Sequence, residues 1–222
     1  MELTEISDRI DTELNSFDGG ISVDEYEKSL YLTKVQKKMY YDLLKAFEMN
    51  GIITHLLKPF LKDAVITTLA VPTPIAIPGA QYFELPVDIE KIVYETATLN
   101  IPADESLHGK VTDVRATKIA EMSYKMDNPF SEPDATETIR VISEKSTSDL
   151  AELHAAAPIS AYNIKYLKKI LPIVLEALPD GLTIDGVGIA TNTVFNDEML
   201  DTIIDGVVKS ILKDKLLQKQ NV

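Results

Sequence analysis

The sequence has 222 residues, of which 45% are hydrophobic and 26% are charged, so its composition is that of a globular chain and not of a disordered one. Its formal net charge of −13, from 35 acidic and 22 basic residues, argues against a protein that wraps nucleic acid, because such proteins need clustered Lys and Arg to neutralise phosphates. The chain contains no cysteine, which excludes disulfide bonds and thiolate metal sites.

The N-terminal part of the chain is predicted to form two helices. In residues 2–16 apolar side chains recur three and four positions apart, which is the spacing of a short amphipathic helix. A second helix is expected from residue 22 to about residue 49, because Ser22 and Glu25 match a capping box and Asn50-Gly51 supplies a left-handed stop. The expected apolar stripe of this helix comprises Leu32, Val35, Met39, Leu43 and Ala46.

The middle of the chain is predicted to be mostly β-structure. After residue 62 the sequence becomes rich in β-branched and aromatic residues, which favour strands. An exception is the helical spacing of apolar residues across residues 111–126, which predicts one helix. The expected strands are residues 64–70, 89–99, 138–142 and 159–167, with a hairpin loop at residues 143–148.

The stretch from Ala64 to Phe83 has no charged residue, and its 20 positions are enough to span a bilayer. Three prolines in this stretch exclude a membrane helix, because each proline removes a backbone donor and breaks a helix. The sequence therefore predicts no membrane span, but a strand followed by an extended arm that contains Pro72, Pro74 and Pro78.

The C-terminal part is predicted to form one helix from an Asn196 cap to about residue 218. Acidic residues follow the expected cap and lysines fill the last turns, so both sets of charges complement the helix dipole. The apolar face of this helix is broader than one packing surface needs, which indicates burial between two surfaces.

Together these elements predict an α+β fold. The N-terminal helical segment and the C-terminal helix are expected to pack together, with a β-rich middle subdomain and an extended proline-containing arm. The predicted parts are a helical segment at residues 1–62, a β-rich subdomain at residues 63–190 with the arm at residues 64–83, and a terminal helix at residues 191–222 that returns to the helical part.

Candidate catalytic and metal-binding residues are few and scattered. His55, His108 and His154 lie far apart and belong to no pair with metal-ligand spacing. The string Asp185-Gly186-Val187-Gly188 lacks the third glycine and the following helix of a nucleotide-binding loop, so a turn is expected there. The sequence therefore predicts a protein that is not an enzyme, with no catalytic residue, no metal site and no cofactor.

Six separated strings of the sequence resemble one family. In chain order they are ISDRIDTELN, EYEKSLYLTKVQKK, YFELPVDIEKIVYE, NPFSEP, YNIKYLKKILPIVL and IIDGVVKSIL. Together they are similar to the neck or tail ring proteins of crAss-like tailed phages, and the resemblance spans nearly the whole chain. Its most specific part is the string from Tyr26 to Gln36.

The resemblance implies a structural protein of the virion. It implies a homo-oligomeric, twelve-fold ring in the neck or tail, between the portal and the tail, whose lumen lets DNA pass without specific binding. An acidic lumen suits this role, because it repels DNA and lets it slide. The chain would be in the host cytoplasm during assembly and in the virion afterwards, in contact with the portal and with other tail or ring proteins.

Contacts between subunits are expected on both long helices and on the arm. Lys34, Lys37 and Lys38 lie off the apolar stripe of their helix, so they are free to meet acids on a neighbouring copy. The other expected interface residues are Ile75 and Ile77 in the arm and Ile204, Val208 and Ile211 in the terminal helix.

Two alternatives stay open on the sequence alone. The first is a small cytoplasmic enzyme with a carboxylate site in the β-rich middle, which would have a deep pocket lined by acids with raised pKa values. The second is a host-interaction protein with an acidic binding face that mimics nucleic acid and does not associate with itself.

Overall fold

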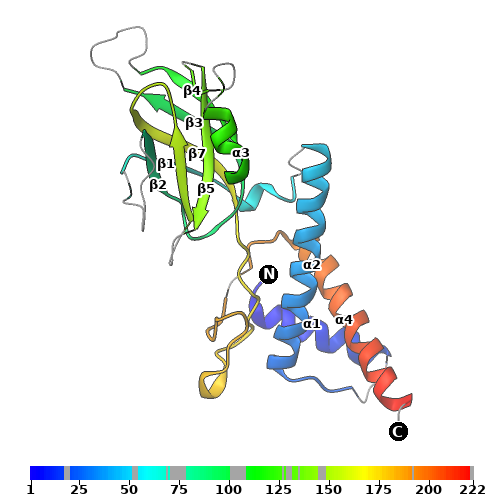
Figure 1. Ribbon diagram of the computed structural model, residues 1–222. Coiled ribbons are helices and arrows are strands. Elements are labelled where there is room, and N and C mark those ends of the chain that lie inside the picture. Colours follow the sequence, from blue (N-terminus) through cyan, green and yellow to red (C-terminus); the bar gives the residue numbers. More distant parts are fainter. Residues whose placement is uncertain are drawn as a thin grey trace. The chain divides into compact units, whose positions relative to one another are not determined.

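The computed structural model divides the chain into two compact units, both drawn in Figure 1. The helical unit comprises Met1–Phe60 and Ile170–Val222, and the sheet unit comprises Leu61–Lys169. The sheet unit is therefore inserted into the sequence of the helical unit. The structure describes residues 1–17, 21–51, 55–68, 70, 79–100, 109–126, 128, 132–134, 136–144, 149–191 and 193–220.

The helical unit is built on α1 (Leu3–Phe17), α2 (Glu25–Asn50) and α4 (Asp197–Gln220). α4 packs against both α1 and α2, which confirms that the N-terminal helical segment and the C-terminal helix pack together. The broad apolar face of α4 makes both contacts. Asn196 caps the helix as predicted, because its side chain accepts a hydrogen bond from the backbone N–H of Met199. The buried apolar residues of α4 are Met199, Leu200, Ile203, Ile204, Val207, Val208 and Ile211.

The start of α2 differs from the prediction, whereas its end agrees. Asp24 is the N-cap, because its side chain accepts a hydrogen bond of 2.7 Å from the backbone N–H of Glu27. The predicted capping box of Ser22 and Glu25 is therefore wrong. The predicted stop is confirmed, since Gly51 takes the left-handed conformation with a φ of 66° and its N–H bonds back into the last turn.

The sheet unit contains one mixed sheet of seven strands in the order β1-β7-β3-β4-β5-β6-β2. All neighbouring strands are antiparallel except β4 and β5, which are parallel. Parallel neighbours need a crossover connection, and α3 (Ile119–Met126) lies in this connection. The strands are β1 (Leu61–Ile66), β2 (Ala80–Glu84), β3 (Ile89–Leu99), β4 (Val111–Ala116), β5 (Glu137–Glu144), β6 (Asp149–His154) and β7 (Ile159–Lys168).

The β-rich middle is confirmed, but the helix predicted over residues 111–126 is wrong in its first half. Val111–Ala116 forms strand β4, because hydrogen bonding to β3 and β5 outweighs a weak helical spacing of apolar residues. Strand β3 has the predicted bounds, and β5 and β7 each extend slightly beyond theirs. Among the described residues, no helix is both long and apolar enough to cross a membrane.

The sheet curls, and contacts from the edge strand β2 help to hold it in this form (Figure 1). The side chain of Gln81 on β2 binds the backbone of Ile159 at the start of β7, accepting from its N–H at 2.5 Å and donating to its carbonyl at 3.4 Å. Beyond the end of β1, the backbone N–H of Ala70 donates to the carbonyl of Tyr82 on β2 at 2.6 Å. The buried core of the sheet unit includes Phe83, Leu85, Ala97, Leu99, Leu153, Tyr162, Ile164 and Tyr166.

A charged network is buried beside this apolar core. Oε2 of Glu95 on β3 accepts from Nε of Arg140 on β5 at 2.7 Å and from the hydroxyl of Tyr162 on β7 at 2.5 Å. None of the three residues is more than 8% exposed, so each charge depends on its protein partners for solvation. Burial, followed by the negative charge of Glu95, raises the pKa of Tyr162, which keeps its hydroxyl protonated as a donor.

The substitution Tyr162→Phe is expected to lower the free energy of unfolding by about 2 kcal/mol, because it removes a donor from the buried Glu95 carboxylate. Tyr166→Phe on the same strand is the matched control. Its hydroxyl donates to Asp88, which is partly exposed and pairs with Lys62, so water can replace the lost donor and the expected loss is below about 1 kcal/mol. Urea unfolding followed by circular dichroism measures both losses, and equal losses would contradict the importance of the buried network.

Candidate subunit interface on the helical unit

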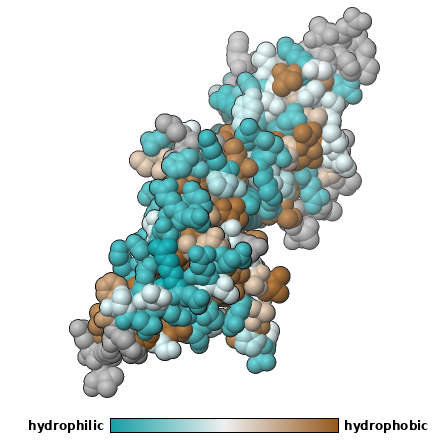
Figure 2. All heavy atoms as spheres, turned by 180° about the vertical axis from the view of Figure 1, so that it is seen from behind, coloured by the Kyte–Doolittle hydropathy of each residue, from teal (hydrophilic) through white to brown (hydrophobic). Residues whose placement is uncertain are grey.

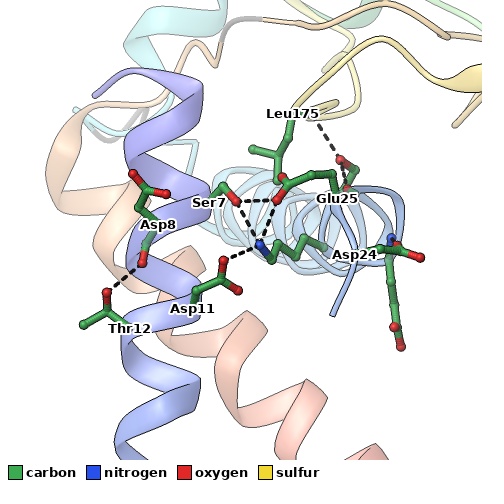
Figure 3. A network of polar contacts seen from close by, with 10 residues as sticks. Ser7, Asp8, Asp11, Thr12, Asp24, Glu25 and Leu175 are labelled. Carbon is green, nitrogen blue, oxygen red and sulfur yellow. Dashed lines mark hydrogen bonds and ion pairs between the residues drawn. The ribbon is translucent and has the colours of Figure 1, made fainter. Parts of the chain in front are cut away.

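Helix α2 carries the three lysines predicted at the interface. Its inner face contacts three other parts of its own subunit. The first part is α1, which a buried lysine holds in place. Lys28 is only 2% exposed. Its Nζ donates to Oγ of Ser7 at 2.9 Å, to Oδ2 of Asp11 at 2.7 Å and to Oε1 of Glu25 at 2.8 Å. Figure 3 shows Ser7, Asp11 and Glu25 converging from the two helices.

The partners of Lys28 keep its side chain charged. Burial by itself lowers the pKa of Lys28, but the hydrogen bonds to Asp11 and Glu25 outweigh burial, so the pKa is raised above its ordinary value. Each of the three ammonium protons has an acceptor, as a buried lysine requires. The lysine therefore fixes the position of α1 along α2.

The second part is an extended segment, residues 171–175, whose backbone is held by polar side chains of α2. Oγ of Ser29 accepts from the N–H of Leu175 at 3.0 Å. One turn later, Oγ1 of Thr33 accepts from the N–H of Ile173 at 3.2 Å and lies 3.3 Å from its carbonyl oxygen. Another turn on, Gln36 donates from Nε2 to the carbonyl of Leu171 at 3.1 Å. One helical turn and two extended residues have similar lengths, about 5.4 and 6.7 Å, so the three side chains match alternate residues of the segment.

The opposite edge of this segment is bound by Thr191. Its hydroxyl accepts from the N–H of Val174 at 3.0 Å and donates to the carbonyl of Pro172 at 2.5 Å, and its own N–H bonds to the carbonyl of Val174 at 3.0 Å. The loop between the segment and Thr191 is tied back to α2 by an ion pair of 2.7 Å between Lys37 and Asp185. Asp185 and Gly186 both have positive φ values, which confirms the turn predicted there.

The third part is α4, which approaches α2 closely. A Cβ atom placed on Gly206 would lie 2.9 Å from Cγ1 of Val35, so only glycine fits this crossing without a shift. Beyond the crossing, the hydroxyl of Tyr31 donates to Asp214 at 2.8 Å. Among the described residues, an exposed side of α2 faces away from these contacts.

The outward face of α2 carries exposed lysines and large apolar residues, and we call this surface the α2 stripe. Its members follow one another at three or four positions, so they lie along one side of the helix. None of its lysines has an ion-pair partner within the described part of the chain. The α2 stripe comprises Leu30, Lys34, Lys38, Tyr41 and Lys45.

A second surface of the helical unit is acidic, and we call it the acidic face. It spans α1 and α4, which are joined there by Arg9, because its guanidinium pairs with both Glu13 and Asp201. Within the described ranges, the carboxylates of Glu198 and Asp205 have no basic partner. The acidic face comprises Glu2, Glu5, Glu13, Asp197, Glu198, Asp201 and Asp205.

The residues predicted at the interface occupy different environments. Lys34 and Lys38 are exposed, whereas Lys37 is partly exposed and holds Asp185 within its own subunit. Ile75 and Ile77 lie outside the described residues. Ile204, Val208 and Ile211 on α4 are 0%, 2% and 0% exposed, so they face the interior of the subunit. An interface role for these three residues stays a prediction.

Other possible chemical sites are sparse. His154 is buried, and its Nε2 lies 2.7 Å from Oε1 of Glu152. His55 is exposed, and His108 is outside the described residues. In the described part of the chain, no group of three His, Asp or Glu residues is arranged to hold a metal ion. A cleft of about 250 Å³ in the sheet unit is small for a ligand pocket. The charged residues that line it are two acidic ones, Glu90 and Asp149, and two basic ones, Lys91 and Arg140.

Comparison with known proteins decides the family. The family model described as phage tail ring protein 3/4 matches residues 1–221. The chain belongs to this phage tail ring protein family. It is 30% identical over 221 residues to Ring protein 3 of Bacteroides phage crAss001, with 95% of each chain covered. It is 23% identical over 228 residues to Ring protein 4/5 of the same phage, with 92% of this chain and 91% of that one covered.

Membership of the ring protein family confirms the resemblance carried by the six sequence strings and gives the chain a structural role in the virion. The match includes both the helical unit and the sheet unit. The family and its relatives are named as ring proteins and not as enzymes. A ring subunit acts through contacts with other subunits, so we take the α2 stripe and the acidic face as the candidate functional site.

The substitution Lys28→Met in this ring protein is expected to lower the free energy of unfolding by about 2 kcal/mol, because Ser7, Asp11 and Glu25 lose their common donor. The expected loss stays below that of a fully buried ion pair, since Asp11 and Glu25 are partly exposed. The raised pKa of Lys28 means that this contribution is complete at neutral pH and is lost only as the pH rises through that raised value.

Chemical denaturation at pH 7 measures this loss. Lys34→Met on the outward face of the same helix is the matched control, and its effect should lie within about 0.5 kcal/mol of zero. If the two methionine variants were equally stable, the buried lysine would not hold α1 to α2.

Proposed function

We propose that this chain forms a homo-oligomeric ring in the neck or tail of a tailed phage, between the portal and the tail, with DNA passing through its lumen. The observation that carries the proposal is the match of the ring protein family over residues 1–221. In the proposed particle the ring has twelve copies and contacts the portal and other ring or tail proteins. The subunits are held in the host cytoplasm until assembly.

The charge of the chain supports passage of DNA without specific binding. The formal net charge of −13 gives the ring a negative field, which repels phosphates. A lumen that repels DNA lets it slide, whereas clustered Lys and Arg would hold it by releasing counterions. In this proposal the exposed lysines of the α2 stripe contact another protein subunit and not DNA, because the acidic face offers carboxylates as partners.

The internal contacts of the helical unit support a rigid, structural role for the subunit. Segments that are far apart in the sequence are joined by buried polar contacts, such as Thr33 with Ile173 and Lys28 with Asp11. Such contacts fix one arrangement of the helices, so the outward face of α2 is presented in a constant position. In this proposal the arm with Ile75 and Ile77 reaches a neighbouring ring.

Mass spectrometry and cryo-electron microscopy of purified particles test this proposal together. We expect the chain among the virion proteins in about the same number of copies as one closed ring requires, and we expect density for it around the DNA path between the portal and the tail. Particles that are complete and infectious without this chain would contradict the proposal, as would density for it outside the neck and tail.

A further inference from the structure

We infer that neighbouring copies of this chain contact each other head to tail, with the α2 stripe of one copy against the acidic face of the next. This inference rests on the proposed ring, and it names the surfaces that build it. The partner of the α2 stripe is thus a second copy of the same chain.

The α2 stripe places two large exposed side chains, one apolar and one aromatic, among three exposed lysines. Leu30 and Tyr41 are 41% and 49% exposed, and they share this side of the helix with Lys34, Lys38 and Lys45. Large apolar or aromatic side chains within a polar rim are typical of specific contacts between proteins. Over its 15 residue steps the stripe extends about 22 Å, at a rise of about 1.5 Å per residue.

Charge complementarity identifies the occupant of the stripe. Three lysines of the stripe lack an ion-pair partner in the described part of the chain, although the chain has 35 acidic and only 22 basic residues. The acidic face supplies possible partners, because Glu198 and Asp205 on α4 are exposed and form no ion pair among the described residues. A second copy therefore satisfies both surfaces at once.

The face drawn in Figure 2 offers no competing apolar surface of large extent. Hydrophilic residues dominate this face, and hydrophobic residues occur on it in small groups. Contacts between copies through this kind of surface depend on charge for register and on a few apolar anchors for affinity. The α2 stripe provides both within one helix.

The two surfaces are different, which has a consequence for symmetry. A head-to-tail contact uses a different surface on each of the two copies, so every added copy still presents one free stripe or one free acidic face. Further copies can therefore add until the arrangement closes on itself. A contact between the α2 stripe and the acidic face is thus compatible with the proposed ring.

Charge reversal on each surface tests the inference. The first variant is Lys34→Glu/Lys38→Glu, and the second is Glu198→Lys/Asp205→Lys. Each is supplied from a plasmid to cells infected by phage that lacks the gene, and its incorporation into particles is measured by mass spectrometry. The matched control for the first variant is Lys58→Glu/Lys118→Glu, which changes the charge equally at exposed lysines outside the stripe. Circular dichroism of each purified variant confirms folding.

We expect each reversal alone to reduce incorporation by at least about tenfold, because like charges then face each other across every contact in the ring. The control should assemble like the natural chain. Supplying the two variants together, or combining both reversals in one chain, should restore incorporation, since opposite charges then meet again.

Three results would overturn the inference, while the proposed ring would stand if the natural chain is present in the particles. The first is unchanged incorporation of the stripe variant. The second is loss with no recovery in the doubly reversed chain, which would assign the stripe to a different protein. The third is loss of DNA retention by the stripe variant with normal incorporation, which would assign the lysines to phosphate contacts.

Discussion

The buried polar side chains on the inner face of α2 hold the helical unit together. Lys28 binds α1, whereas Ser29, Thr33 and Gln36 bind the backbone of residues 171–175. Each of these contacts satisfies a backbone or charged group that would otherwise be buried without a partner, at a cost of about 1–3 kcal/mol. Because the inner face is occupied in this way, the α2 stripe is an exposed part of the helix, and we propose that other subunits bind there.

Sequence periodicity located the long helices but not the contacts between them. Apolar spacing correctly predicts that α1, α2 and α4 are helices, but it does not predict which face of α2 is buried. Of the predicted apolar stripe of α2 only Leu32 is buried, and Ala46 is exposed. The buried face includes Ser29, Thr33 and Gln36, which resemble surface residues in a sequence. The backbone groups that these three side chains bind lie 135 to 146 positions away in the sequence. No local sequence pattern therefore indicates these contacts. Residues 111–116 show the opposite case, where a local spacing of apolar residues was overruled by pairing with other strands.

The candidate site could be predicted in part. Lys34 and Lys38 were identifiable because they lie off the apolar stripe, and the same helical spacing extended by one and two turns would have added Tyr41 and Lys45. The acidic face could not be found in this way, because it combines α1 with α4, whose residues meet only in the folded chain. Lys37 also lies off the predicted apolar stripe of α2, as Lys34 and Lys38 do. Its contact with Asp185 is visible only in three dimensions.

The central claim is that the inner face of α2 builds the subunit and its outer face builds the ring. Acetylation of lysines followed by mass spectrometry tests this most directly, by comparing the natural chain free in solution with the same chain in particles. We expect Lys34, Lys38 and Lys45 to react in the free subunit and to become protected in the particle, while Lys28 stays protected in both. Equal labelling of the three stripe lysines in the two states would contradict the account.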